Sequence, residues 1–245
     1  MIIGAMIVLM IWLWATVPHI PKAEFGRRTA EEYGCFGCHG PGGIQGVPNP
    51  GRADLTVPSF TGDLMMFASS REDIHSWIEN GFTPGREKSA SWHQERQKGA
   101  LKMPAFGHKL SRKEINNLVA YVEAVNGWNR PQDSLALLGM NRADSLGCFG
   151  CHGPGGRLAR QNPKSFKGYI ASWSTEDFPE LVENRGEFDE WVTNGAANRI
   201  VNNPLGRYFL KRATIKMPPF KDHLRPGDLD ALWAYVQWLR SNPQN

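Results

Sequence analysis

The sequence predicts a small all-α protein in which an N-terminal apolar helix precedes two tandem copies of one loop-rich helical domain. Three observations lead to this prediction: an uncharged N-terminal segment, an internal repeat, and apolar residues at helical spacing without an alternating strand pattern. We expect a transmembrane anchor at residues 1–20, a first domain at 21–128 and a second domain at 129–245.

The composition limits the class of protein. Of the 245 residues, 41% are hydrophobic and 21% are charged, so the chain can bury a core but is too polar for a polytopic membrane protein. Lys and Arg number 28 and Asp and Glu number 24, which gives a formal net charge of +4. So small and evenly spread an excess does not indicate nucleic-acid binding, and we expect no nucleic-acid partner.

The first 17 residues, MIIGAMIVLMIWLWATV, contain no charged side chain. As a helix rising about 1.5 Å per residue they would span roughly 25 Å, near the short limit for crossing a bilayer. A signal peptide is the alternative, but the segment lacks a basic n-region and an A-x-A cleavage site. We therefore expect an uncleaved single-pass anchor that contacts the lipid bilayer through residues 1–17. The basic residues Lys22, Arg27 and Arg28 that follow would favour the cytoplasmic side for that end.

The rest of the chain contains an internal repeat. Residues 34–43 read GCFGCHGPGG, and residues 147–156 read the same ten letters at an offset of 113. Three further pairs of segments match at an offset of 114: 77–81 with 191–195, 102–106 with 216–220, and 118–122 with 232–236. Two tandem copies of one domain therefore follow the anchor. The breaker-rich sequence NGWNRP at 126–131 is the predicted linker.

The helices of the first copy are predicted from spacing and end signals. A helix at 23–33 leads into the first cysteine pair, and a second at 71–80 ends before a glycine. Ser111 and Glu114 form a capping box that begins a third helix, at 111–125. The second copy repeats the last two at 187–194 and at about 226–239. Loops rich in Gly and Pro connect these helices.

Each ten-residue repeat contains the sequence C-x-x-C-H, at Cys35, Cys38 and His39 and again at Cys148, Cys151 and His152. This is the signature of c-type haem attachment. Two thiols one helical turn apart can form thioethers with the two vinyl groups of one porphyrin. The adjacent His then ligates the iron from the proximal side. We expect two covalently attached haem c groups.

Three other uses of a C-x-x-C pair are less consistent with this sequence. A zinc site would use the pairs jointly and needs no His after each pair. A thioredoxin-like redox pair would need a β-α-β context, which is absent from the prediction. A disulfide across so short a gap would be strained. Duplication of the whole motif inside a repeated domain favours haem over all three.

The sixth iron ligand separates an electron carrier from a catalyst, because an open position could bind a small molecule. Met103 and Met217 occur in the matching sequences KMPAF and KMPPF, each shortly before the last helix of its copy. We expect these two methionines to be the distal ligands. Rival side chains occur at non-matching positions: Met65, Met66, His75, His93, His108 and His223.

With these motifs, each half resembles a class I c-type cytochrome domain, and the whole is similar to a membrane-anchored dihaem cytochrome c over residues 23–240. The positions that match the family pattern are Gly26, Cys35, Cys38, His39, Gly40, Met103, Pro104 and Tyr121, and in the second half Gly139, Cys148, Cys151, His152, Gly153, Met217, Pro218 and Tyr235. The resemblance implies that a loop proline carbonyl accepts a hydrogen bond from each proximal His. Pro58 fits this role, and Pro163 is the candidate in the second half, where the segment has one residue more.

The resemblance also implies a function, which is electron transfer without substrate chemistry or catalytic residues. We expect the chain to carry electrons between membrane-embedded oxidoreductase subunits and another redox partner protein, in a respiratory or photosynthetic chain. Haem is attached outside the cytoplasm. The haem domains are therefore expected on the periplasmic or extracellular side of the inner membrane, despite the basic residues after the anchor.

Two other functions remain open from the sequence. The chain could be a fixed dihaem subunit of a complex like the cbb-type oxidases. It could also be a dihaem enzyme, such as a peroxidase or a thiosulfate dehydrogenase, which would need an open or weakly ligated iron. The paired M-P-x-F sequences argue against the enzyme.

Local charge differs between the copies. The stretch 191–220 contains five basic residues and no acidic one: Arg199, Arg207, Lys211, Arg212 and Lys216. The corresponding stretch 77–106 has five basic residues but also Glu79, Glu87 and Glu95. This pattern predicts a basic rim at the second haem that steers an acidic partner. The alternative is a solvated surface, or charges that neutralise haem propionates.

Overall fold

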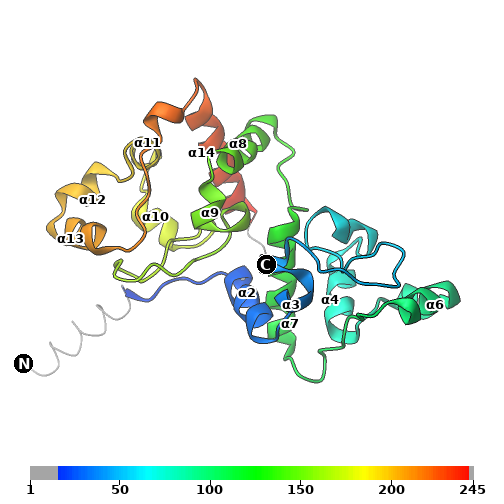
Figure 1. The fold of residues 1–245 in the computed structure, drawn as a ribbon. Helices are drawn as coiled ribbons and strands as arrows, with labels where there is room; N and C mark the ends of the chain where they lie inside the picture. The colour runs from blue at the N-terminus through cyan, green and yellow to red at the C-terminus, as the bar shows by residue number, and fades with distance from the viewer. Residues whose placement is uncertain (1–15, 243–245) are drawn as a thin grey trace, which may run out of the picture. The chain divides into compact units, whose positions relative to one another are not determined.

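The structure is a computed structural model that describes residues 16–242 (Figure 1). Helices and short 3-10 turns form the regular structure. Within that range the strand-like pairing consists of two isolated bridges, Pro48 with Thr56 and Gln161 with Tyr169. The described residues are therefore helical, as predicted.

The prediction of an N-terminal transmembrane helix at residues 1–20 is corrected. In the part of the chain that the structure describes, no helix has both the length and the apolar character to cross a bilayer. Residues 1–15 of the predicted helix lie outside the described residues, and residues 17–21 are irregular chain. Pro18 and Pro21 explain this irregular stretch, because proline lacks a backbone N–H and disfavours a helical conformation in the preceding residue. The predicted bilayer contact through residues 1–17 depended on the same helix, and residues 1–15 of it lie outside the described range.

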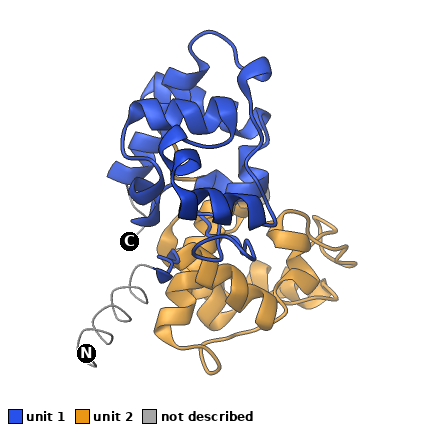
Figure 2. Ribbon diagram, turned by 90° about the vertical axis from the view of Figure 1, so that its left-hand side faces the viewer, with its two compact units in different colours: residues 1–21, 131–243 blue, residues 22–130, 244–245 orange. Residues whose placement is uncertain are grey.

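Contacts divide the chain into two compact units, which Figure 2 shows in separate colours. Residues 22–130 form one unit, called the first domain below. Residues 131–243 form the other together with the N-terminal segment 1–21, and this unit is called the second domain. The division falls inside the NGWNRP sequence.

The helices of the first domain alternate with long loops. In chain order they are α2 (Lys22–Glu32), α3 (Phe36–His39), η1 (Pro41–Gly43), η2 (Gly62–Met66), α4 (Arg71–Asn80), α5 (Pro84–Glu87), α6 (Ala90–Lys98) and α7 (Arg112–Asn126). The capping box of Ser111 and Glu114 is present at the start of α7. Helix α6 was missed by the sequence analysis because it shows no apolar period; Trp92 is its buried residue.

The second domain repeats this order, except that an α-helix (α10) takes the place of η2 and one 3-10 turn (η4) is added. Its elements are α8 (Ser134–Ser145), α9 (Cys148–His152), η3 (Pro154–Gly156), α10 (Asp177–Leu181), α11 (Arg185–Asn194), α12 (Asn198–Asn202), α13 (Pro204–Arg212), η4 (Lys221–His223) and α14 (Asp228–Ser241). Helices α12 and α13 stand where α5 and α6 stand in the first domain and were not predicted either; none of their residues is buried.

The first and last helices of each domain pack closely against each other, α2 on α7 and α8 on α14. A Cβ atom on Gly26 would lie 1.9 Å from the carbonyl oxygen of Asn117, and one on Gly139 would lie 1.8 Å from that of Ala231. No side chain fits at such distances, so glycine is required at both crossings. The repeated glycines that the sequence analysis matched are explained by this packing.

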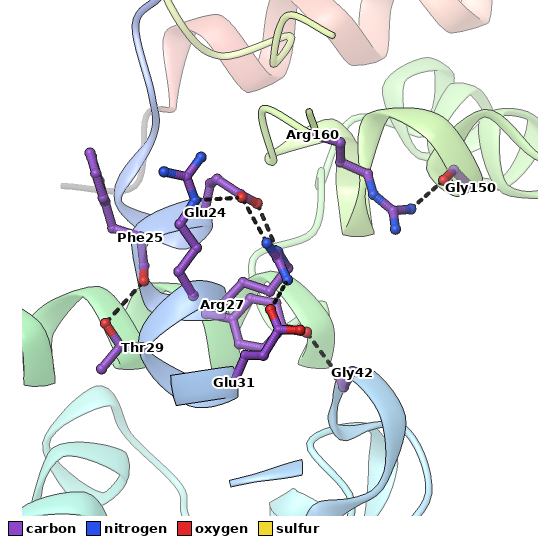
Figure 3. A network of polar contacts seen from close by, with 10 residues as sticks. Glu24, Phe25, Arg27, Thr29, Glu31, Gly42, Gly150 and Arg160 are labelled. Carbon is purple, nitrogen blue, oxygen red and sulfur yellow. Dashed lines mark hydrogen bonds and ion pairs between the residues drawn. The ribbon is translucent and has the colours of Figure 1, made fainter. Parts of the chain in front are cut away.

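A buried charge on α2 is neutralised locally. The side chain of Glu24 is fully buried, and its carboxylate accepts hydrogen bonds from Nε and Nη2 of Arg27, each at 3.0 Å (Figure 3). Arg28 donates to the same carboxylate, and Arg27 also reaches Glu31. Two guanidinium groups therefore stabilise a carboxylate that would otherwise be costly to bury.

Candidate functional site

Each C-x-x-C-H sequence forms one short helical turn. Cys35 precedes α3 and His39 ends it, with the His39 N–H donating to the Cys35 carbonyl at 3.0 Å. In the second domain Cys148 begins α9 and His152 ends it. The four cysteines are free thiols. One turn of helix therefore presents two thiols and an imidazole from each copy.

The histidines of both turns donate to a backbone carbonyl. Nδ1 of His39 lies 2.7 Å from the carbonyl oxygen of Pro58, and Nδ1 of His152 lies 3.2 Å from that of Ala171. Because a carbonyl can only accept, Nδ1 carries the proton in both rings, and Nε2 has a free lone pair. Desolvation lowers the pKa of His39 and lowers that of His152 to about 4. Both rings are therefore neutral near pH 7, as metal ligation requires.

The partner carbonyl confirms the expectation for Pro58 and corrects the one for Pro163. The carbonyl of Pro163 accepts instead from the N–H of Thr214 at 3.1 Å. Ala171 stands 113 residues after Pro58, so the offset of the cysteine motifs extends to this position. Keeping that offset, rather than searching for the next proline, would have found Ala171.

An aromatic ring packs beside each of these histidines. The ring centroids of His39 and Phe60 are 4.6 Å apart, and those of His152 and Trp173 are 4.9 Å apart. Tyr121 and Tyr235 anchor the adjoining turns, since their hydroxyls donate to the carbonyls of Gly42 and Gly155, both at 2.9 Å. The proximal side is built alike in the two domains, from residues at the same offsets.

The loops with Met103 and Met217 lie against the end of a helix. The N–H of Phe106 donates to the carbonyl of Ile78 on α4, and the N–H of Phe220 donates to that of Val192 on α11, both at 3.0 Å. The repeated W-x-x-x-G sequences, at residues 77–81 and 191–195, are therefore the helix ends against which the methionine loops pack. We call each of these helix ends a helix seat.

The glycine that ends each seat allows the methionine backbone to approach. A Cβ on Gly81 would lie 2.6 Å from the Met103 carbonyl oxygen, and one on Gly195 would lie 2.5 Å from that of Met217. Both glycines also have φ near +80°, a conformation that other residues adopt only with strain. Glycine is therefore needed for two reasons at each position.

Side-chain packing connects the methionine loops with the cysteine turns. In the second domain, Cys148 and Met217 pack against the same buried apolar cluster, which includes Trp173 and Tyr235. In the first domain, the ring of Phe106 lies edge-on to that of Tyr33, with centroids 6.4 Å apart. Met103 and Met217 themselves are half-buried.

The rival ligands have other surroundings. Met65 and Met66 are exposed on η2. Nδ1 of His75 lies 3.6 Å from the Glu79 carboxylate. Nε2 of His93 bonds to the carbonyl of Glu87 at 2.6 Å. The remaining two, His108 and His223, are exposed.

The basic stretch of the second domain is smaller than predicted. Arg199 is engaged by Glu187, with Nε 2.6 Å from the carboxylate, and by Glu183 at 3.3 Å. This ion pair lowers the pKa of Glu187. The exposed basic side chains that remain lie on or just after α13, none of whose residues is buried: Arg207, Lys211, Arg212 and Lys216. The apolar side chains Leu205 and Tyr208 are exposed on the same helix.

One group of possible metal ligands lies away from these motifs. His19, Asp177 and Glu180 bring their ligand atoms close together. The ammonium of Lys167 already lies 2.8 Å from Asp177 and 2.7 Å from Glu180. A cation is therefore built into this cluster, which ties the N-terminal segment to the second domain.

Comparison with known proteins gives one family match. Residues 21–122 match the family model described as cytochrome C oxidase, cbb3-type, subunit III. That range contains the first C-x-x-C-H turn and Met103. No curated protein matches the chain.

A search of solved structures gives a weak likeness. One chain of the Kuenenia stuttgartiensis reducing HAO-like protein complex is 19% identical, and the alignment covers 90% of this chain and 99% of that chain. The TM-score is 0.30, which is too low to carry an argument about the fold.

The residues in both domains fit a covalently bound haem c. The donor set is two free thiols on one helical turn, a neutral imidazole with a free Nε2 and a half-buried thioether. These are the groups that attach and ligate such a haem. The fit is the same in the second domain, which the family match does not include.

Proposed function

From the premise that residues 21–122 are a cytochrome c family domain, we propose that the chain is a dihaem c-type cytochrome that transfers electrons between redox partners. The duplicated bond from His Nδ1 to a carbonyl, at His39 and again at His152, is the observation that carries the proposal. A local C-x-x-C-H match can arise by chance. A second histidine oriented in the same way, with a matching methionine loop, supports a second haem.

The chain's own residues would hold and tune each group. When bound, haem c supplies a reversible one-electron change at its iron. Cys35 and Cys38 would hold the first haem covalently, and Cys148 and Cys151 the second. The hydrogen bond at Nδ1 fixes each imidazole plane and raises the basicity of Nε2. Met103 and Met217 would close the sixth position with a thioether, which favours reduced iron and raises the potential.

The same residues would exclude substrate chemistry at the iron. If Met103 and Met217 close the sixth positions, no site is left there for a small molecule. Phe60 and Trp173, both buried, pack beside the proximal rings. We therefore propose a carrier without catalytic residues, located outside the cytoplasm, where c-type haem is attached.

The family description supports a second candidate. Subunit III of a cbb3-type oxidase is a fixed part of a larger enzyme, and this chain would then pass electrons within such a complex. Purification at low salt, with identification of bound proteins by mass, separates the candidates. A stoichiometric oxidase subunit would favour the fixed subunit, and a chain that purifies alone would favour the carrier.

Haem stoichiometry tests the proposal. A pyridine haemochrome assay on the intact chain should give two haems that resist extraction by acid acetone. The double variant Cys148→Ser with Cys151→Ser should retain one. A single haem in the wild-type chain would contradict the dihaem assignment.

Ligation is tested separately by spectroscopy. The oxidised protein should show the weak near-infrared band typical of a Met–iron bond, and Met103→Ala or Met217→Ala should each remove half of it. Each variant should then bind CO at the altered haem. Met65→Ala, which changes an exposed methionine, is the control and should leave the band intact. CO binding by the wild-type protein would favour an enzyme instead.

A further inference from the structure

An Asn-Pro pair recurs in both domains. Asn49-Pro50 and Asn162-Pro163 are separated by the same offset of 113 as the cysteine motifs. The asparagine side chains are buried, with 4% and 6% of their surface exposed. A buried amide is costly unless both of its polar ends find partners, so such a residue usually has a specific structural task.

Both asparagines bind the chain that leads into the methionine. Nδ2 of Asn49 donates to the carbonyl of Leu101 at 3.0 Å, and Oδ1 accepts from the Leu101 N–H at 2.8 Å. Asn162 makes the same two bonds to Ile215, again at 3.0 and 2.8 Å. The two amides therefore each hold a single residue by both of its backbone groups.

The proline carbonyl adds a third bond one residue earlier. The N–H of Ala100 donates to the carbonyl of Pro50 at 3.0 Å, and that of Thr214 donates to Pro163 at 3.1 Å. The residue after each proline has a left-handed backbone, with φ of +88° at Gly51 and +69° at Lys164. A non-glycine residue takes this conformation only under strain, so the turn keeps its shape in the second domain at a cost.

The residues that the asparagines hold, Leu101 and Ile215, lie two positions before the methionines. On the other side, the seat described above holds Phe106 and Phe220, three positions after Met103 and Met217. Each methionine thus lies in a short stretch of backbone that is fixed at both ends. The asparagine and proline contacts, called the clamp below, hold the upstream end, and the helix seat holds the downstream end.

We propose that Asn49 and Asn162 are positioning residues that hold the Met103 and Met217 loops so that each thioether sulfur can ligate its iron. This inference rests on the proposed function, since it concerns the distal ligand of each haem. A Met–iron bond is weak enough to be lost when its loop loosens. Buried hydrogen bonds to the adjacent backbone oppose that loosening.

The variants Asn49→Leu and Asn162→Leu test the inference. Leu has nearly the shape of Asn but no hydrogen-bonding groups. Each variant should keep two covalent haems, lose half of the near-infrared Met–iron band, bind CO at one reduced haem and lower the potential of that haem. The unchanged domain in the same molecule serves as an internal reference. Asn49→Asp keeps the shape and the acceptor but loses the donor, and a partial loss is expected from it even if Asn49→Leu does not fold.

Asn126→Leu is the matched control. Asn126 also uses its side chain to hold a loop, with Nδ2 donating to the carbonyls of Phe60 at 3.1 Å and Thr61 at 2.8 Å on the proximal side. This variant should lower stability but leave the full band. An equal loss of band in Asn126→Leu would assign the effect to general loosening and overturn the positioning role.

Two further outcomes separate failure of the clamp from failure of the proposed Met ligation. A full band and no CO binding in folded Asn49→Leu or Asn49→Asp would contradict the clamp while leaving Met ligation intact. A wild-type protein without any band would contradict Met ligation itself, and the clamp with it.

Discussion

Nδ1 of His152 lies 3.2 Å from the carbonyl oxygen of Ala171, whereas Nδ1 of His39 lies 2.7 Å from that of Pro58. The two acceptors differ in side chain but not in the group that accepts. A backbone carbonyl is present at every residue, so alanine can replace proline at this position without loss of the bond. The lengths differ, however, and this has a consequence for the two proposed haems.

The longer bond predicts a higher potential for the second haem. A shorter hydrogen bond from Nδ1 makes Nε2 a stronger donor and so stabilises oxidised iron, which lowers the potential. A redox titration should resolve two waves, with the lower one from the first domain. The Cys148→Ser with Cys151→Ser variant assigns the waves, because it should retain the lower one. Retention of the higher wave would contradict the prediction.

The glycines at the helix crossings predict a strong effect on stability. Gly26→Ala and Gly139→Ala would each place a methyl group less than 2 Å from a backbone carbonyl oxygen, so the helices must separate. We expect a loss of about 1–3 kcal/mol in the free energy of unfolding, as for overpacking elsewhere. Urea denaturation measures it. Gly85→Ala, with no atom within 4 Å of the added Cβ, is the control and should change stability little. Equal effects at all three sites would argue against the crossing as the cause.

The ion pair of Arg142 and Asp228 predicts a dependence of stability on pH. Both side chains are largely buried, with Nη2 and Oδ2 2.6 Å apart, and the pair joins α8 to α14. The hydrogen bond from Arg142 holds the pKa of Asp228 below its usual value of 3.8. The pair therefore contributes fully above that value, and its contribution is lost as the pH falls through the lower folded pKa.

Asp228→Asn tests this dependence. The variant should be less stable at neutral pH and should lose less stability than the wild type on acidification, as measured by urea denaturation at a series of pH values. Asp222→Asn, at an exposed position, should follow the wild-type curve. If Asp228→Asn loses as much stability on acidification as the wild type, other titrating groups dominate the pH dependence of stability.

The exposed basic residues of α13 predict salt-dependent docking. Reversing Arg207, Lys211 and Arg212 to Glu should slow electron transfer with an acidic partner at low ionic strength, and the difference should shrink as salt screens the charges. Stopped-flow kinetics over a salt series measure this. The same reversal at Lys88, Lys98 and Lys102 of the first domain, where Glu87 and Glu95 intervene, should have a smaller effect. Equal rates in both triple variants would leave α13 without a docking role.

Much of the fold could be predicted from the sequence because its signals are local. The start of α7 follows from the capping box at Ser111, and the ends of α4 and α11 follow from Gly81 and Gly195. Helices α6 and α13 could not be predicted in this way, because they pack few apolar residues. The predicted transmembrane helix rested on apolar composition alone, and no helix of the described residues has the length and apolar character to cross a bilayer.

The sequence by itself determined the donor groups of each C-x-x-C-H turn, because two thiols and an imidazole within five residues share one turn of helix wherever that turn lies. Only the tertiary structure decided which groups act on that turn. Ala171, rather than Pro163, supports His152, since a carbonyl acceptor leaves no trace in the residue type. Asn49 reaches Leu101 across 52 positions of the chain, and Arg199 is withdrawn from the basic surface by Glu187. The repeat offset points to Ala171 only once the Pro58 bond is known, and the contacts of Asn49 and Arg199 depend on distances in space, which residue spacing along the chain does not encode.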